Sequence, residues 1–199
     1  MQHRGTFIEQ ARRAQMVQCA VEEIAENGYP AASLAAIARR AGVSRGVISY
    51  HFADKDDLVE QVIADFYRLG AAFIGERLKG LTGVRAIVRA FIEANVEFFA
   101  AYPVHVRASR DIVLTYRTAA GARIDQRRPE AAQGRAALLD LFAQGQASGD
   151  LRRFDREAMA TAIRAAVDGA VPELTLNPDF DLTAYGRELA TTFDHAIRS

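Results

Sequence analysis

The sequence predicts an all-helical protein, and three observations lead to that fold class. Half of the 199 residues are hydrophobic, and they recur at the three- and four-residue intervals that place side chains on one face of a helix. Alanine, a strong helix former, is the dominant residue. The five prolines fall mostly between the periodic segments, and the alternation of β-branched and polar residues typical of strands is scarce. The pattern accommodates about nine helices.

The first three predicted helices follow one another closely. They cover residues 7–27, 34–41 and 44–50. Gly42 gives the chain between the two short helices the backbone freedom of a tight turn, and Ser44 is a suitable N-cap for the helix that follows. Two short helices joined by a glycine-containing turn, the second with small and polar residues on its outer face, are typical of a helix-turn-helix that reads DNA.

Six further helices are predicted from residue 54 onward, and they form a second helical domain. Asp54 caps the first of them, and Pro172 is expected to end the fifth, because proline lacks the amide hydrogen that a helix interior needs. The predicted spans are 55–79, 84–101, 105–116, 129–149, 156–171 and 182–199. The predicted domains are therefore residues 1–53 and residues 54–199.

The segment AGVSRGVISYHFADKDDL, residues 41–58, resembles the signature of the TetR family of transcriptional regulators. A Ser-basic-Gly helix start runs into an aromatic-His-Phe corner, and Lys55 then opens the next helix. The resemblance covers residues 6–60 closely, whereas beyond them only length and helix layout agree. It implies an N-terminal helix-turn-helix DNA-binding domain and a C-terminal helical domain for ligand binding and dimerisation.

The helix that begins after Ser44 carries side chains suited to base edges and phosphates. Arg45 can fork onto guanine O6 and N7, or can touch only phosphate, and Val47 can contact a thymine methyl group. The family resemblance implies that Tyr50 and His51 clamp phosphate, although His51 can equally be a corner residue bonded within the protein. The predicted DNA-binding residues are Ser33, Ser44, Arg45, Gly46, Val47, Ser49, Tyr50, His51 and Lys55.

Two positions of this helix depart from the family pattern. Members often have Thr or Ser where Val47 stands and an aromatic residue where Ser49 stands. Because both side chains are expected to face DNA, the operator sequence of a relative does not transfer to this chain.

One short helix gives too little affinity for a specific DNA complex, so a twofold dimer on a near-palindromic operator is expected. Apolar stripes on the last two predicted helices offer the interface, as in the family. The same spacing also fits packing within the chain, at least for residues 156–171. The predicted interface residues are Met159, Ile163, Val167, Ala170, Tyr185, Leu189 and Phe193.

An aromatic stripe on residues 84–101 suggests what the second domain senses. Asn95 interrupts this stripe, and a buried amide needs a polar partner, either from a neighbouring helix or from a ligand. Arg110 can pair with a ligand anion, or can lie on a solvated face, and the aromatic residues can also be plain core. The candidate ligand-binding residues are Phe66, Phe73, Phe91, Asn95, Phe98, Tyr102, Arg110, Leu114, Tyr116 and Phe142.

Composition and missing motifs narrow the remaining function classes. The formal net charge is 0, and residues 1–55 carry seven basic against five acidic side chains, a net +2, so charge alone does not predict a polyanion partner. The single cysteine excludes an intrachain disulfide, and no HExxH, phosphate-binding loop or nucleophile elbow occurs. No catalytic residue, metal site or cofactor is expected. The chain shows no signal peptide and no apolar run of membrane-spanning length, which predicts a cytoplasmic protein.

The sequence therefore predicts a ligand-responsive transcriptional repressor. As a homodimer it would bind a double-stranded DNA operator, and an unidentified small-molecule effector would release it by favouring a DNA-incompetent form. The alternative is a helical interaction module, or an enzyme using the C-terminal domain, in which DNA binding is secondary or lost.

Overall fold

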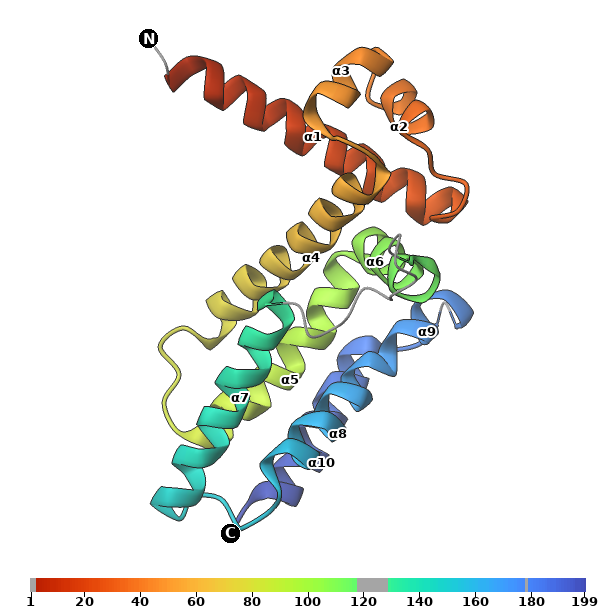
Figure 1. The fold of residues 1–199 in the computed structure, drawn as a ribbon. Coiled ribbons are helices and arrows are strands. Elements are labelled where there is room, and N and C mark those ends of the chain that lie inside the picture. The colour runs from red at the N-terminus through yellow and green to blue at the C-terminus, as the bar shows by residue number, and fades with distance from the viewer. Residues whose placement is uncertain (1–2, 118–128, 178) are drawn as a thin grey trace. The chain divides into compact units, whose positions relative to one another are not determined.

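The computed structural model describes residues 3–117, 129–177 and 179–199 of the chain. Ten helices lie in these residues (Figure 1), and an isolated antiparallel bridge joins Leu151 and Arg198. The predicted all-α fold is thereby confirmed. The helices are α1 (His3–Asn27), α2 (Leu34–Arg40), α3 (Arg45–His51), α4 (Lys55–Leu78), α5 (Val84–Ala101), α6 (Pro103–Thr115), α7 (Pro129–Ser148), α8 (Arg156–Asp168), α9 (Ala170–Leu176) and α10 (Leu182–Ile197).

Side-chain caps begin most of the short helices where the sequence places them. The side chain of each cap accepts a hydrogen bond from the backbone N–H three residues later, which satisfies one of the free amides of the first turn. The capping distances are 3.1 Å for Ser33, 3.3 Å for Ser44, 2.8 Å for Asp155 and 2.8 Å for Asp181.

Pro172 does not end a helix as predicted. Helix α8 already ends at Asp168, and Pro172 lies in the first turn of the separate helix α9. Proline is tolerated there because the amide groups of a first turn have no partner within the helix. Pro103 likewise opens α6.

The chain folds into two compact units, and they divide it differently from the predicted boundary at residue 53. The N-terminal unit contains residues 1–66 and 104–125, and the C-terminal unit contains residues 67–103 and 126–199. The first half of α4 and nearly all of α6 therefore pack with the helix-turn-helix. The two units are joined within α4 and at the start of α6.

In the N-terminal unit, α2 and α3 form an angled pair beside α1 (Figure 1). The inner face of the pair is anchored by three buried side chains, Ile37, Ile48 and Phe52, which are at most 1% exposed. Burying three side chains of this size contributes several kcal/mol to folding by the hydrophobic effect, on the order of 2 kcal/mol each. The core thus fixes the helix-turn-helix from its inner face.

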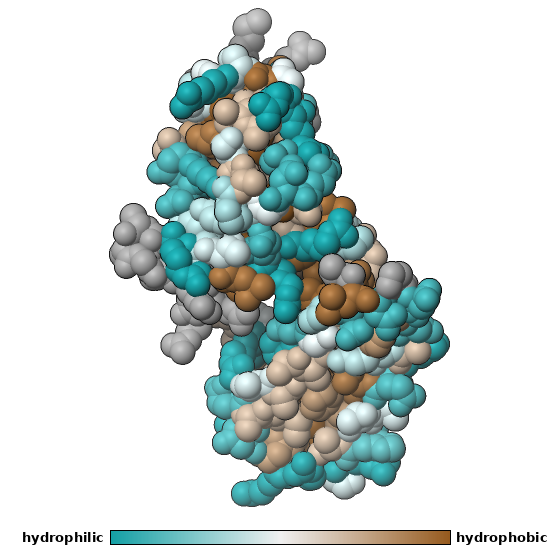
Figure 2. Space-filling model, turned by 90° about the vertical axis from the view of Figure 1, so that its right-hand side faces the viewer, coloured by the Kyte–Doolittle hydropathy of each residue, from teal (hydrophilic) through white to brown (hydrophobic). Residues whose placement is uncertain are grey.

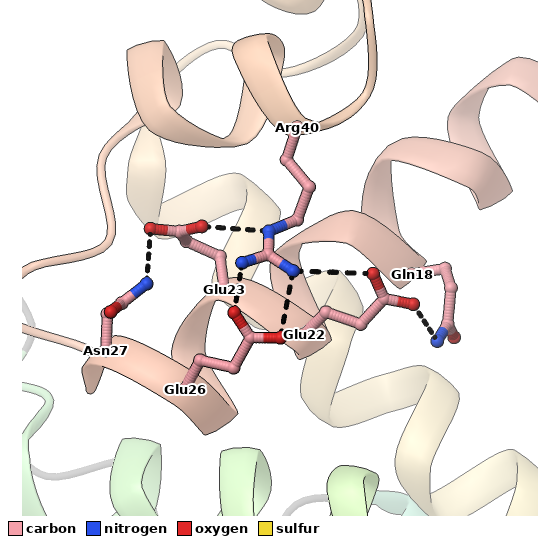
Figure 3. Close-up of polar contacts among 6 residues, drawn as sticks. All are labelled: Gln18, Glu22, Glu23, Glu26, Asn27 and Arg40. Atoms are coloured by element: carbon pink, nitrogen blue, oxygen red, sulfur yellow. Dashed lines mark hydrogen bonds and ion pairs between the residues drawn. The ribbon is translucent and has the colours of Figure 1, made fainter.

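Polar contacts fix α2 to α1 along the rim of this core (Figure 3). The Arg40 guanidinium of α2 donates from Nε to Glu23 Oε2 at 2.9 Å and from Nη1 to Glu26 Oε1 at 3.1 Å. Its Nη1 also lies 3.7 Å from Glu22 Oε2. The hydrogen bonds to these carboxylates raise the pKa of Arg40 above its ordinary value. Since the three carboxylates lie on two adjacent turns of α1, one side chain sets the position of α2 along that helix.

The turn that leads from α1 to α2 is held by α4 and α6. Lys55 donates to the Tyr29 carbonyl oxygen at 2.6 Å, and its ammonium lies 3.9 Å from the centre of the Tyr29 ring. Asp111 of α6 accepts a hydrogen bond from the Tyr29 amide. The buried ring of Tyr116 meets the Tyr29 ring edge-on, with centroids 5.5 Å apart. Residues from three segments of the chain therefore converge on this one turn.

The C-terminal unit is built around the packing of α10 on α5. Gly186 of α10 lies so close to α5 that an added β-carbon would stand 3.3 Å from Val96 Cβ. At the far end of the contact Arg85 binds Asp194 in a bidentate pair, with N···O distances of 2.8 and 2.6 Å. The close approach and the ion pair together fix the register of the two helices.

The environment of Tyr116 predicts a stability change at alkaline pH. Burial, together with a hydrogen bond to the Asp56 carboxylate, raises the pKa of Tyr116 from 10.0 to about 12. Between these two values the unfolded chain loses the Tyr116 proton and the folded chain keeps it, so the stabilisation is complete below pH 10 and is lost as pH rises through 12. The free energy of unfolding should therefore fall less steeply over this window in Tyr116→Phe than in the unmodified protein. Urea titrations at a series of pH values measure both slopes, and equal slopes would contradict the assignment.

Candidate nucleic-acid interface

The outer face of α3 is open to solvent along its whole length. Ser44, Arg45, Gly46, Val47, Ser49 and Tyr50 are all exposed, whereas Ile48 between them is fully buried. Tyr50, at 74%, and Val47, at 38%, are among the most exposed large apolar side chains in the described part of the chain. A helix that displays small, polar and aromatic side chains outward while a single isoleucine anchors it has the geometry of a DNA recognition helix.

The first turn of α3 combines a capped amide with an uncrowded backbone. The Ser44 hydroxyl accepts the Val47 amide, so it serves the helix as a cap while its side chain remains exposed. At Gly46 the nearest atom to an added β-carbon is Ser44 Oγ at 3.8 Å. Because Gly46 has no side chain, a base pair or phosphate can approach the backbone closely here.

The last turn of α3 borders a shallow hollow of about 400 Å³ between α1 and α3, lined by Glu9, Gln10, Arg13, Tyr50 and His51. The Tyr50 hydroxyl donates to Glu9 Oε1 at 3.3 Å, and its ring meets the His51 ring edge-on at 5.1 Å. The two side chains expected to clamp phosphate therefore lie side by side at the rim of a polar hollow.

Lys55, by contrast, is engaged inside the N-terminal unit. It is half-buried, and burial lowers the pKa of its ammonium group, while the Asp56 carboxylate opposes that shift. Its bond to the Tyr29 carbonyl takes one of its three N–H donors. Ser33 is exposed at the start of α2 and caps it. In the unbound chain both residues have structural contacts beside the role predicted for them.

Arg13 of α1 is a residue that the sequence reading missed. Its guanidinium donates to the backbone carbonyl of His51, 38 positions along the chain, and covers the Phe52 ring. No local motif signals such a contact, because it depends on the crossing of α1 and α3.

The aromatic stripe of α5 forms a closely packed cluster in the C-terminal unit. The Phe98 ring lies 5.6 Å from Phe73 of α4 and 5.2 Å from Tyr102, and Phe73 lies 5.8 Å from Tyr102. Asn95 is 4% exposed and donates to the Phe91 carbonyl oxygen at 2.8 Å. Its other amide atom, Oδ1, accepts from Arg164 of α8 at 3.5 Å. The buried amide thus finds its partners on its own helix and on a neighbouring one.

The remaining candidate ligand-binding residues are spread over both units. Phe142 is fully buried in the C-terminal unit and packs edge-on against Phe154 at 5.2 Å. Phe66, Arg110, Leu114 and Tyr116 belong to the N-terminal unit. Arg110 and Leu114 are exposed there, and Tyr116 packs on Tyr29. The ten candidates are therefore divided between the two units.

The residues predicted for the subunit interface fall into two groups, one buried within the subunit and one partly exposed. Ile163, Val167 and Ala170 are at most 1% exposed within their own subunit, so they have no surface left for a partner, contrary to the prediction. The reason is that this face of the α8–α9 segment packs into the C-terminal unit. The other predicted interface residues, Met159, Tyr185, Leu189 and Phe193, are partly exposed.

The face of α8 beside that stripe is open and made of small residues. Ala158, Ala162 and Ala165 are exposed on successive turns, and the Tyr185 hydroxyl of α10 donates to the Ala166 carbonyl at 2.6 Å, which ties the two helices together. Figure 2 shows an apolar area, coloured brown and tan, on the C-terminal unit with polar side chains around it. Small side chains on such a surface allow close approach of another helix.

Two other kinds of site are absent from residues 3–117, 129–177 and 179–199. No three His, Cys, Asp or Glu side chains stand close enough there to hold a metal ion. None of the helices in this part of the chain has the length and apolar character needed to cross a membrane.

The sequence profile of the bacterial regulatory proteins of the tetR family matches residues 17–62, which comprise most of α1, the helix-turn-helix and the start of α4. This segment of the chain is therefore similar to the TetR family. Among its relatives, HTH-type transcriptional regulator BetI 1 of Chromohalobacter salexigens is 39% identical over 87 residues, 43% of each chain. BetI of Burkholderia mallei is 36% identical over 91 residues, 45% of this chain and 47% of that one. The chain thus matches less than half the length of these curated relatives.

Solved TetR-type structures resemble the fold over nearly the whole chain. A TetR family transcription regulator from Marinobacter aquaeolei VT8 has a TM-score of 0.74 at 19% identity and covers 100% of both chains. FadR from Bacillus subtilis in complex with stearoyl-CoA has a TM-score of 0.72 at 20% identity, over 93% of this chain and 99% of that one. At this identity the likeness concerns the fold alone. The two BetI relatives are named as HTH-type transcriptional regulators.

Proposed function

We propose that this chain is a TetR family protein and acts as a ligand-responsive transcriptional repressor of the cytoplasm that binds a near-palindromic operator as a homodimer. The observation that carries the proposal is the recognition helix α3, whose outer face is exposed while Ile48 and Phe52 beneath it are fully buried. The outer face of α3 is exposed, and the buried side chains beneath it hold the helix in place. Such a helix is suited to binding in a groove of DNA.

In this proposal α3 lies in the major groove of double-stranded DNA. Arg45, at the start of the helix, forks onto guanine, and Val47 and Ser49 contact neighbouring base edges. Tyr50 and His51 reach the phosphates that border the hollow between α1 and α3. Lys55 has two N–H donors beyond its bond to Tyr29, and these remain suited to a phosphate at the start of α4.

The open faces of α8 and α10 support a twofold dimer. We place the subunit interface on the small residues Ala158, Ala162 and Ala165, with Met159, Tyr185, Leu189 and Phe193 around them. Two subunits joined in this way would form a four-helix seam. The symmetric arrangement would let two copies of α3 occupy half-sites about one helical turn of DNA apart.

The C-terminal unit supports the binding of a small molecule. The cluster of Phe73, Phe98 and Tyr102 offers an apolar wall. Arg164, whose side chain is 50% exposed, stands beside the Asn95 amide and is held on its other edge by Asp168. These groups suit an effector with an apolar body and an oxygen acceptor at one end. The related fold of FadR in complex with stearoyl-CoA is consistent with an effector of that general kind.

Release from DNA follows by population shift. To lower DNA affinity a hundredfold, the effector must bind the DNA-incompetent form more tightly by about 2.7 kcal/mol. We place the path between the C-terminal unit and the reading helices in α4 and the start of α6, where the chain passes from one unit to the other.

Arg45 provides the direct test of the DNA surface. If it forks onto guanine, Arg45→Ala should lose about 1–3 kcal/mol of binding free energy, roughly ten- to a hundredfold in affinity. Fluorescence anisotropy with the DNA upstream of the protein's own gene measures this at fixed salt, and binding should weaken steeply as salt rises. Arg153→Ala, which removes an exposed arginine between α7 and α8, serves as the control and should bind normally. Full affinity in Arg45→Ala would refute the assigned surface.

The dimer surface has its own test. Ala162→Glu places a charge in the middle of the small-residue face, and two such charges meet near the twofold axis, so the protein should become monomeric and lose operator affinity. Ala72→Glu adds the same charge at an exposed position of α4 and should leave the dimer intact. Light scattering coupled to gel filtration measures both masses. A dimeric Ala162→Glu, or a monomeric unmodified protein, would contradict the proposal.

A further inference from the structure

We propose that Arg13 is a positioning residue for DNA reading: it fixes the C-terminal end of the recognition helix without touching DNA itself. The inference rests on the proposed DNA-binding function, and it concerns a residue outside the helix-turn-helix. Arg13 lies on α1, and its side chain is 35% exposed.

The first contact is with the end of α3. A helix of seven residues leaves most of its carbonyl groups without a partner inside the helix. Arg13 Nη1 donates to one of these, the backbone oxygen of His51, which is the last residue of α3. A hydrogen bond from a charged donor is stronger than one between neutral groups, and here it holds the end of the helix from the outside.

The second contact is with the residue that follows. The guanidinium carbon of Arg13 lies 4.3 Å from the centre of the Phe52 ring. Phe52 is fully buried, so its ring is a fixed point of the core. Stacking on that ring restricts the plane of the guanidinium and directs its N–H groups toward the helix ends on either side.

The third contact is with the first turns of α4. Arg13 Nη2 lies 3.6 Å from Asp57 Oδ1 and 3.4 Å from Gln61 Oε1. Asp57 also accepts the Ala53 amide at 3.1 Å, which closes the connection between α3 and α4. One side chain of α1 is therefore bonded to the end of α3, to the corner residue and to the start of α4.

This arrangement fixes the direction in which α3 leaves the protein surface. Because Tyr50 and His51 occupy the last turn of α3, a small rotation of that turn moves the phosphate contacts relative to Arg45 at the other end. A lysine reaches the same place but lacks the planar fork that serves two directions at once.

A direct phosphate contact is the competing role for Arg13, since it lines the hollow beside Tyr50 and His51. The two roles differ in their salt dependence. Removing a phosphate contact reduces the slope of log affinity against log salt by about one, whereas misplacing the helix lowers affinity without changing the number of ions released.

The experiment uses a duplex selected by the unmodified protein from a random library, together with a scrambled duplex of equal length. Arg13→Met should bind the selected duplex about tenfold more weakly and discriminate less between the two duplexes, with an unchanged salt slope. Arg13→Lys, which keeps the charge and one donor, should recover part of the loss. Arg12→Met is the matched control, because Arg12 is an exposed neighbour on α1 whose guanidinium donates across one turn to Gln15 Oε1 at 3.3 Å.

Circular dichroism melts at the binding temperature establish that each variant is folded. If Arg13→Met is unfolded, Arg13→Lys is the variant that tests the proposal. Full affinity of Arg13→Lys for the selected duplex, with full discrimination against the scrambled one, would overturn the proposal. A salt slope lowered by one in Arg13→Met would also overturn it, in favour of a phosphate contact. If the unmodified protein selects no sequence at all, the proposed function fails instead, so the two failures are distinguishable.

Discussion

The attachment of α3 to the rest of the N-terminal unit is the constraint on which the structure depends. A helix of seven residues is too short to be stable alone, because the entropy of forming its first turn is repaid by only a few hydrogen bonds. It exists here because Ser44 caps its start, the fully buried Ile48 holds its middle, and Phe52 and Arg13 hold its end. All of these contacts are on the inner face or at the ends. Apart from the bond that the Tyr50 hydroxyl donates to Glu9, the stability of α3 rests on these contacts, and its outer face is exposed to a ligand.

Contacts from α4 and α6 explain why the N-terminal unit includes more than the first three helices. The turn around Tyr29 receives bonds from Lys55 of α4 and Asp111 of α6, and the Tyr116 ring packs beside it. Helix α6, which lies 50 or more positions beyond the helix-turn-helix in sequence, is thus part of the unit that carries α3.

Local features of the fold were predictable from the sequence, and the long-range ones were not. The cap Ser44 and the glycine turn at Gly42 depend on neighbouring residues, and both were predicted. A stripe such as Ile163 and Val167 shows only that one helix face is buried. Whether it is covered by its own subunit or by a partner depends on helices elsewhere in the chain, and here it is the former.

The candidate site shows the same division. The exposed side chains of α3 were identified from their motif, whereas the bond from Lys55 to Tyr29 and the contacts of Arg13 arise from helix crossings that no spacing reveals. Tyr116 was assigned to a ligand wall because aromatic residues look alike in sequence whether they line a cavity or brace a turn. Pro172 was wrongly predicted to end a helix, because the break lies three residues earlier at Gly169, and proline fits the first turn of the new helix that starts there.

Methylation interference tests the central claim most directly. Dimethyl sulfate modifies guanine N7 in the major groove and adenine N3 in the minor groove, so it reports which groove the protein needs. On a duplex selected from a random library, guanine methylation should block binding in two clusters about ten base pairs apart, on one face of the DNA. Interference at adenines alone, or in a single cluster, would contradict a paired α3 in successive major grooves.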